Sequence, residues 1–86
     1  MPQISRFYVI IILMNFNDHM PPHFHAYYGD YECCIDIKEI ERIHGDMPNK
    51  QLKMLLGWAA IHQEELEENW YLARKKQELF KVEPLK

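Results

Sequence analysis

Apolar residues follow two different periods along this chain, one in each half. From Arg6 to Asn15 they form a run that is apolar on both faces, which is typical of a buried central strand. The stretches His23–Tyr28 and Tyr31–Ile37 are separated by Gly29-Asp30, a two-residue turn signal that predicts a hairpin. A short fourth strand is expected near Glu41–His44. The first half therefore predicts a small antiparallel sheet.

The second half has the period of a helix. Pro48 suits a first helical turn, and no proline interrupts the chain from Asn49 to Lys76. An α-helix turns by about 100° per residue, and at this rotation the apolar residues line up as one stripe along the helix. This stripe should pack against the sheet. Its members are Leu52, Leu55, Ala59, Leu66, Trp70 and Ala73. The sequence thus predicts an α+β fold, in which a small antiparallel sheet of three or four strands packs against one long C-terminal helix. Residues 1–76 would form this single domain, and residues 77–86 a loosely ordered tail.

Composition and charge narrow the classes of function. The chain has 86 residues, enough for one small domain, and its net charge of −3 argues against a strongly basic nucleic-acid binder. Any RNA contact should use the Arg74-Lys75-Lys76 cluster together with the histidines. A disulfide between the adjacent Cys33 and Cys34 would be strained, and two reduced thiols fit a cytoplasmic protein. The apolar run 7–14 is too short to span a bilayer, so no membrane association is expected.

Candidate chemistry concentrates in the histidines. His19, His23 and His25 lie within seven residues, and Pro21 and Pro22 stiffen the turn before the predicted strand. Histidine has an unperturbed pKa near neutrality, so it can act as an acid, a base or a metal ligand. Because side chains alternate along a strand, His23 and His25 should point to the same face. This arrangement predicts that His23 and His25 form the base of a functional site.

A polar line on the predicted helix supplies further candidates. Trp58, His62, Glu65 and Asn69 are spaced by four, three and four residues, so they share one side of the helix beside the apolar stripe. If the histidine strand meets that side, the two groups converge on one site. The alternative is that Glu65 and Asn69 are solvated and that His62 is a half-buried spacer.

Three segments of the chain carry a likeness to a known family. They are Met1–Tyr8, Phe16–Gly29 with its His-x-Pro-Pro-His-Phe-His-Ala core, and Trp58–Trp70. Through them the chain resembles the bacterial domain-of-unknown-function 4160 family over nearly its whole length. The resemblance implies a small cytoplasmic protein encoded beside a second small protein. It also implies the toxin side of a type II toxin–antitoxin module, with that neighbour as an antitoxin-like partner.

The first functional hypothesis is metal-independent cleavage of RNA, which requires no cofactor. His23 and His25 would act as the acid/base pair on the 2′-hydroxyl and the leaving 5′-oxygen, with His62 or His19 assisting.

Supporting roles in this hypothesis fall to the polar line and to aromatic residues. Asn69 would position the substrate by donating a hydrogen bond, and Glu65 would orient an imidazole. Tyr28 would stack on a base or donate a hydrogen bond, and His19 and Trp58 are further candidates for substrate binding.

The second hypothesis is a metal site, because His-x-His on a strand can present two imidazoles to one ion. His23 and His25 would bind zinc or another divalent metal. Further donors would come from Asp18, His19, His62 and Glu65.

The third hypothesis is a module without catalysis, whose histidine loop binds a partner protein. The first strand is apolar on both faces, whereas a single helix covers only one face of a sheet. A homo-oligomer, or a complex with the antitoxin-like protein, is therefore expected.

Overall fold

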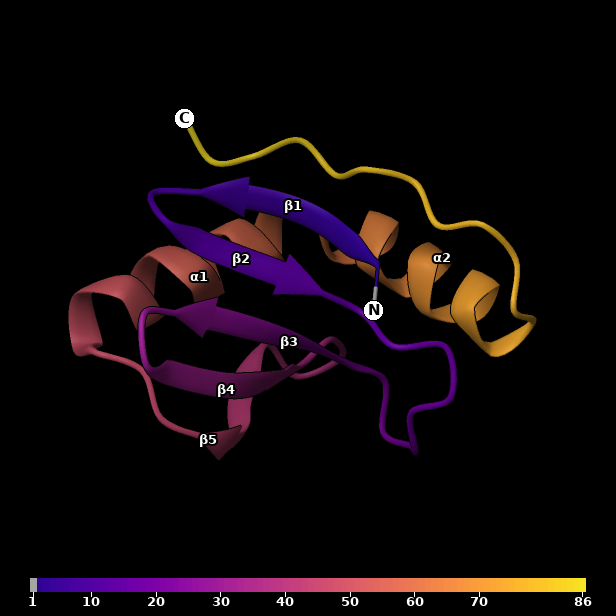
Figure 1. Ribbon diagram of the computed structural model, residues 1–86, viewed down its shortest axis with the longest axis horizontal. Helices are drawn as coiled ribbons and strands as arrows, with labels where there is room; N and C mark the ends of the chain where they lie inside the picture. The colour runs from indigo at the N-terminus through magenta and orange to yellow at the C-terminus, as the bar shows by residue number, and fades with distance from the viewer. Residues whose placement is uncertain (1) are drawn as a thin grey trace.

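A five-stranded antiparallel sheet carries two helices on one of its faces (Figure 1). The computed structural model describes residues 2–86, and each strand pairs with the next strand along the chain. The elements are β1 (Gln3–Phe7), β2 (Ile10–Leu13), β3 (His23–Tyr28), β4 (Tyr31–Asp36), β5 (Glu41–Gly45), α1 (Asn49–Ile61) and α2 (Gln63–Arg74). The predicted α+β class is confirmed. The prediction of three or four strands and one long helix is wrong.

The extra strand arises because the first apolar run folds back on itself. Tyr8 and Val9 form a two-residue turn with φ values of 48° and 66°, and Phe7 pairs directly with Ile10. Tight hairpin turns of this kind need positive φ at their central residues, which glycine and asparagine adopt most easily. Neither residue type occurs at this turn, so the expected strand 6–15 showed no break. The result is two short strands in place of one.

The helical half is interrupted at His62, whose φ of −106° and ψ of 24° lie outside the helical region. A new helix then begins at Gln63, with Glu64 and Glu65 in its first turn. Acidic side chains there interact favourably with the positive end of the helix dipole. Gly57, the only glycine between Pro48 and Lys76, lies within α1 and does not mark the break. Because no proline or glycine stands at the break, the run of good helix formers predicts one long helix, and the structure has two.

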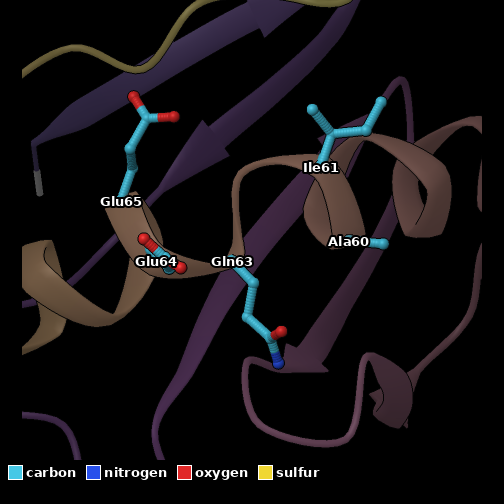
Figure 2. A pocket seen from close by; sticks show the side chains of 5 residues that line it. All are labelled: Ala60, Ile61, Gln63, Glu64 and Glu65. Carbon is cyan, nitrogen blue, oxygen red and sulfur yellow. The ribbon is translucent and has the colours of Figure 1, made fainter.

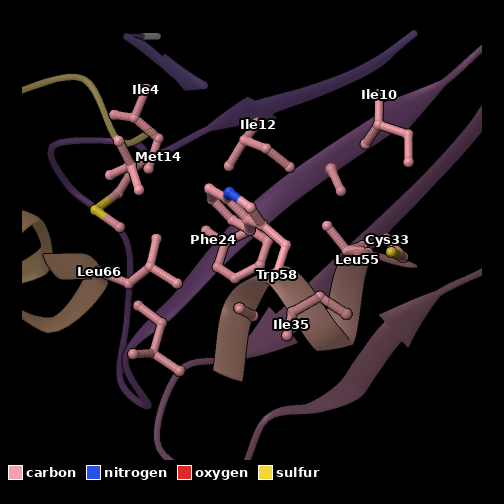
Figure 3. Close-up of a cluster of buried hydrophobic side chains, with 14 of the residues drawn as sticks. Ile4, Ile10, Ile12, Met14, Phe24, Cys33, Ile35, Leu55, Trp58 and Leu66 are labelled. Atoms are coloured by element: carbon pink, nitrogen blue, oxygen red, sulfur yellow. The ribbon is translucent and has the colours of Figure 1, made fainter. Parts of the chain in front are cut away.

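The core lies between the sheet and the helices, and Trp58 is at its centre (Figure 3). Its side chain is fully buried, with ring centroids 5.0 Å from Phe7 and 5.8 Å from Phe24. The Trp58 Nε1–H donates a hydrogen bond of 2.8 Å to the carbonyl oxygen of Glu83. One side chain therefore joins α1, the sheet and the C-terminal segment.

Residues 77–86 contain no helix or strand, yet they run beside β1 (Figure 1). The Val82 N–H donates to the Ile4 carbonyl at 2.7 Å, and the Lys81 ammonium donates to the Gln3 carbonyl at 2.6 Å. Val82 is only 2% exposed. This segment therefore lies along the edge of the sheet formed by β1. No helix within residues 2–86 is long and apolar enough to cross a membrane.

Replacement of Gly57 by alanine should stabilise the protein. Gly57 lies inside α1, and a Cβ added to it would meet nothing within 4 Å. Glycine in an exposed helix costs about 0.5–1 kcal/mol relative to alanine, so the free energy of unfolding should rise by roughly that amount. Urea denaturation followed by circular dichroism measures it.

The matched control is Gly45→Ala, which should destabilise the protein. Gly45 has φ of +81°, and its added Cβ would clash with the carbonyl oxygen of Glu32. A loss of stability in Gly57→Ala would contradict the placement of Gly57 in α1.

Candidate functional site

The two histidines of β3 alternate with core residues, so they point to the other face of the sheet, which we call the open face. Phe24 and Ala26 alternate with them and are fully buried in the core. His23 and His25 are half-buried, and Cys34 of β4 lies directly across from His25 in the strand pairing. The prediction that His23 and His25 share a face is confirmed by this alternation.

Asp18 connects the two imidazoles. Its Oδ2 atom lies 2.9 Å from His25 Nε2 and 3.3 Å from His23 Nε2. The three side chains are 13–20% exposed, and the two imidazole ring centroids are 5.2 Å apart. One carboxylate from the loop between β2 and β3 therefore serves both rings.

The contacts of His23 define which of its nitrogens carries hydrogen. Nδ1 lies 2.8 Å from the carbonyl oxygen of Pro21. A carbonyl oxygen only accepts hydrogen bonds, so Nδ1 is the donor. In the neutral ring, Nε2 of His23 then keeps its lone pair.

His25 has the opposite tautomer. Its Nε2 is the donor, because the Asp18 carboxylate at 2.9 Å only accepts. Its Nδ1 therefore keeps the lone pair and lies 3.4 Å from the Cys34 sulfur. The Asn15 side-chain amide, whose nitrogen is placed 3.2 Å from the same Nε2, fits better with its oxygen toward this donor. That orientation also gives a donor to Asn15 Oδ1, which is otherwise buried without a partner within residues 2–86.

The two adjacent cysteines are both free and differ in their surroundings. Cys33 belongs to the core, and burial raises the pKa of its thiol to about 11. Cys34 lies on the open face, where burial first and then the Glu32 and Asp18 carboxylates raise its thiol pKa. Both thiols are therefore protonated at neutral pH unless a cation binds to them.

Arg74 lies beside this group. It lines a hollow of about 270 Å³ together with Phe16, Asn17 and Asp18. Its guanidinium lies 5.9 Å from the ring centroid of Trp70, and that ring is 5.4 Å from His23. The hollow therefore borders the histidine site and carries both signs of charge.

The predicted convergence of the helix candidates with the strand histidines is not seen. His62 Nδ1 pairs with Glu65 Oε1 at 2.6 Å, and the His62 ring lies 5.5 Å from that of Trp58. Glu65 lines a separate hollow at the junction of α1 and α2 (Figure 2). Within residues 2–86, no hydrogen bond, ion pair or ring contact joins His62 or Glu65 to the open-face pair.

The other predicted site residues also lie apart from the pair. Asn69 is fully buried and exchanges two hydrogen bonds, of 2.9 and 3.0 Å, with the backbone of Phe80. Trp58 is in the core, and the Tyr28 hydroxyl accepts a hydrogen bond of 3.3 Å from Gln51. His19 is an exposed loop residue. The surroundings of Trp58 and Asn69 are structural, which the helical spacing did not reveal.

The comparisons with known proteins identify a family but no activity. The model of a family described as "Domain of unknown function (DUF4160)" matches residues 9–71. No curated protein and no solved structure matches the chain. The matched residues contain Asp18, His23, His25 and Cys34, whereas Arg74 lies just beyond them.

Replacement of Asn69 by alanine should lower the free energy of unfolding by about 1–3 kcal/mol, because the N–H and C=O of Phe80 lose their buried partners. Thermal and urea denaturation measure the effect. The exposed neighbour Glu68→Ala should stay within about 0.5 kcal/mol of wild type. Equal stability of Asn69→Ala and wild type would contradict the structural role of Asn69.

Alkaline pH should destabilise the protein through Cys33. Its pKa of about 11 in the folded state lies above the ordinary value of 9.0, so the unfolded chain releases this proton first. The contribution is complete below pH 9 and disappears as pH rises toward 11. Urea denaturation between pH 8 and 11 should show a shallower loss of stability for Cys33→Ala than for wild type. Parallel curves would rule out this linkage.

Proposed function

Because the chain belongs to the DUF4160 family, for which no reaction is described, we propose its function from the site: cleavage of RNA at the open-face histidines. We propose further that it does so as the toxin of a toxin–antitoxin module in the cytoplasm. The single observation that carries the proposal is the position of Arg74 beside Asp18, which adds a guanidinium to the histidine site.

Phosphate recognition is the first requirement of an RNA-cleaving site. A guanidinium can bind two phosphate oxygens at once, and stacking on an aromatic ring orders its long side chain. Arg74 lies over Trp70, and Trp70 lies against His23. A phosphate bound by Arg74 would therefore lie close to the imidazoles. The acidic net charge of the chain is compatible with this local cation.

Two routes to cleavage are open to such a site. In the first, His23 and His25 transfer protons to and from the ribose oxygens, as expected from the sequence. In the second, the same side chains hold a metal ion that activates water and polarises the phosphate. The two routes use the same residues and predict the same loss on their removal, but they differ in their response to chelators.

A module that only binds a partner protein is the second candidate, and the turn between β1 and β2 favours it. Tyr8 is 57% exposed and Val9 65% exposed, an unusual position for two adjacent apolar side chains. The antitoxin-like small protein would be this partner, and a homo-oligomer is the other expected assembly. Size-exclusion chromatography with light scattering distinguishes these assemblies from a monomer.

Induced expression of the wild-type chain should slow bacterial growth, and the purified chain should cleave single-stranded RNA. The double variant His23→Ala/His25→Ala should lose at least about 100-fold of the cleavage rate and relieve the growth defect. Arg74→Ala should weaken RNA binding with the fold retained, because a phosphate partner is removed. Circular dichroism checks that each variant is folded, and His25→Gln serves if the double variant is not.

Two matched controls test whether the effect belongs to the site. His62 pairs with Glu65 at the junction of α1 and α2, and Lys75 lies beside Arg74 but places its ammonium 4.3 Å from the ring centroid of Tyr71. His62→Ala and Lys75→Ala should behave as wild type. Growth inhibition that survives in the folded double variant would sink the RNA proposal and leave the partner-binding module.

A further inference from the structure

We propose that His23, His25 and Cys34 bind a transition-metal ion of the zinc class on the open face, with Asp18 orienting His25 and the Pro21 carbonyl orienting His23. One donor atom from each of the three residues lies within 4.8 Å of the others. The inference deepens the proposed function, because it supplies the ion of the second cleavage route, but metal binding itself does not depend on RNA cleavage.

The hydrogen bonds of the two rings are those that metal-binding histidines make. Such a histidine almost always donates its second ring N–H to a carboxylate or a backbone carbonyl, which holds the ring in position. His23 donates through Nδ1 to the Pro21 carbonyl, and His25 donates through Nε2 to Asp18. The lone pairs left for an ion are on Nε2 of His23 and on Nδ1 of His25.

The Cys34 sulfur lies at a suitable distance from His25 Nδ1 for both atoms to bind one ion. With zinc–sulfur and zinc–nitrogen bonds of about 2.3 and 2.05 Å, a tetrahedral ion separates sulfur from nitrogen by roughly 3.5 Å. The observed distance from Cys34 Sγ to His25 Nδ1 is 3.4 Å. An ion can therefore bridge these two atoms without a change in the β3–β4 pairing.

Charge at the site favours a cation. Glu32 Oε2 lies 4.0 Å from His25 Nδ1, and Asp18 lies on the other side of the same ring. When a divalent ion binds, the Cys34 S–H bond breaks, its proton passes to solvent, and the sulfur lone pair forms the metal–sulfur bond. The Glu32 and Asp18 carboxylates disfavour a thiolate without a metal, but they stabilise the positively charged complex of the ion with the Cys34 thiolate.

The donor set selects the class of metal. Two imidazoles and one thiolate suit Zn²⁺ and Co²⁺, whereas Mg²⁺ and Ca²⁺ prefer oxygen donors. Three protein donors leave one tetrahedral position for water, as in zinc sites that hydrolyse their substrates. Arg74 and the hollow beside Asp18 would then place a phosphate near that water.

The test is titration of the chelator-treated full chain with Co²⁺, followed by optical absorption. Wild type should show the charge-transfer band of a cobalt–thiolate bond and the visible bands of tetrahedral Co²⁺, at one ion per chain, and Zn²⁺ should abolish them. Cys34→Ala should lose the charge-transfer band. Its neighbour Cys33→Ala should keep it, because that thiol lies in the core.

The roles of His23, His25 and Asp18 are tested by measuring the affinity of each variant for Co²⁺. His23→Ala and His25→Ala should weaken Co²⁺ binding by more than 100-fold, and Asp18→Asn by about 10- to 100-fold with the band retained. His62→Ala should leave the affinity unchanged, because the His62 ring pairs with Glu65 at the junction of α1 and α2.

The outcomes separate this inference from the proposed function. A folded wild type without a charge-transfer band, or a band that persists in Cys34→Ala, overturns the metal site. RNA cleavage that continues in chelator without cobalt binding also overturns it and leaves the proton-transfer route. Cobalt binding without any RNA cleavage supports the metal site and removes the RNA proposal.

Discussion

The register of β3 against β4 is the constraint on which both the core and the candidate site depend. A two-residue turn that includes Gly29 in a left-handed conformation places Phe24 opposite Ile35, and His25 opposite Cys34. Successive side chains point to opposite faces, so a slip of one residue would exchange these two sets. The imidazoles would then enter the apolar core, and aromatic side chains would face solvent. Core burial therefore holds the histidines in place.

Charge on the open face depends on a second element, the loop before β3. Asp18 reaches both rings from this loop and determines which nitrogen of His25 is the donor. Asp18 and Arg74 also line the same hollow. A small acidic chain thus has one place where imidazole, thiol, carboxylate and guanidinium lie together. This mixture is the physical basis for a ligand that carries charge, whether a metal ion or a phosphate.

The polar residues of the helices stabilise the fold and do not belong to the candidate site. His62 and Glu65 pair at the point where α1 ends and α2 begins, and Asn69 satisfies the backbone of Phe80. A domain of this size buries few apolar side chains, so polar contacts that fix the C-terminal segment matter for its stability. The helical period grouped these residues on one side of a single helix, but the break at His62 divides that helix in two. It contained no information about which part of the sheet that side would meet.

The sequence by itself determined the α+β class, the hairpin at Gly29-Asp30 and the shared face of His23 and His25, because these depend on local periodicity and turn chemistry. The two-residue turn also implies that His25 pairs with Cys34, but the predicted site did not include Cys34. The turn at Tyr8-Val9 could not be predicted, since residues other than glycine adopt a positive φ only when packing compensates its cost. The break at His62 could not be predicted either, because no proline or glycine marks it. Only the tertiary structure decided that Asp18 and Arg74 join the histidines and that His62 and Asn69 do not, because such contacts link segments far apart in the chain.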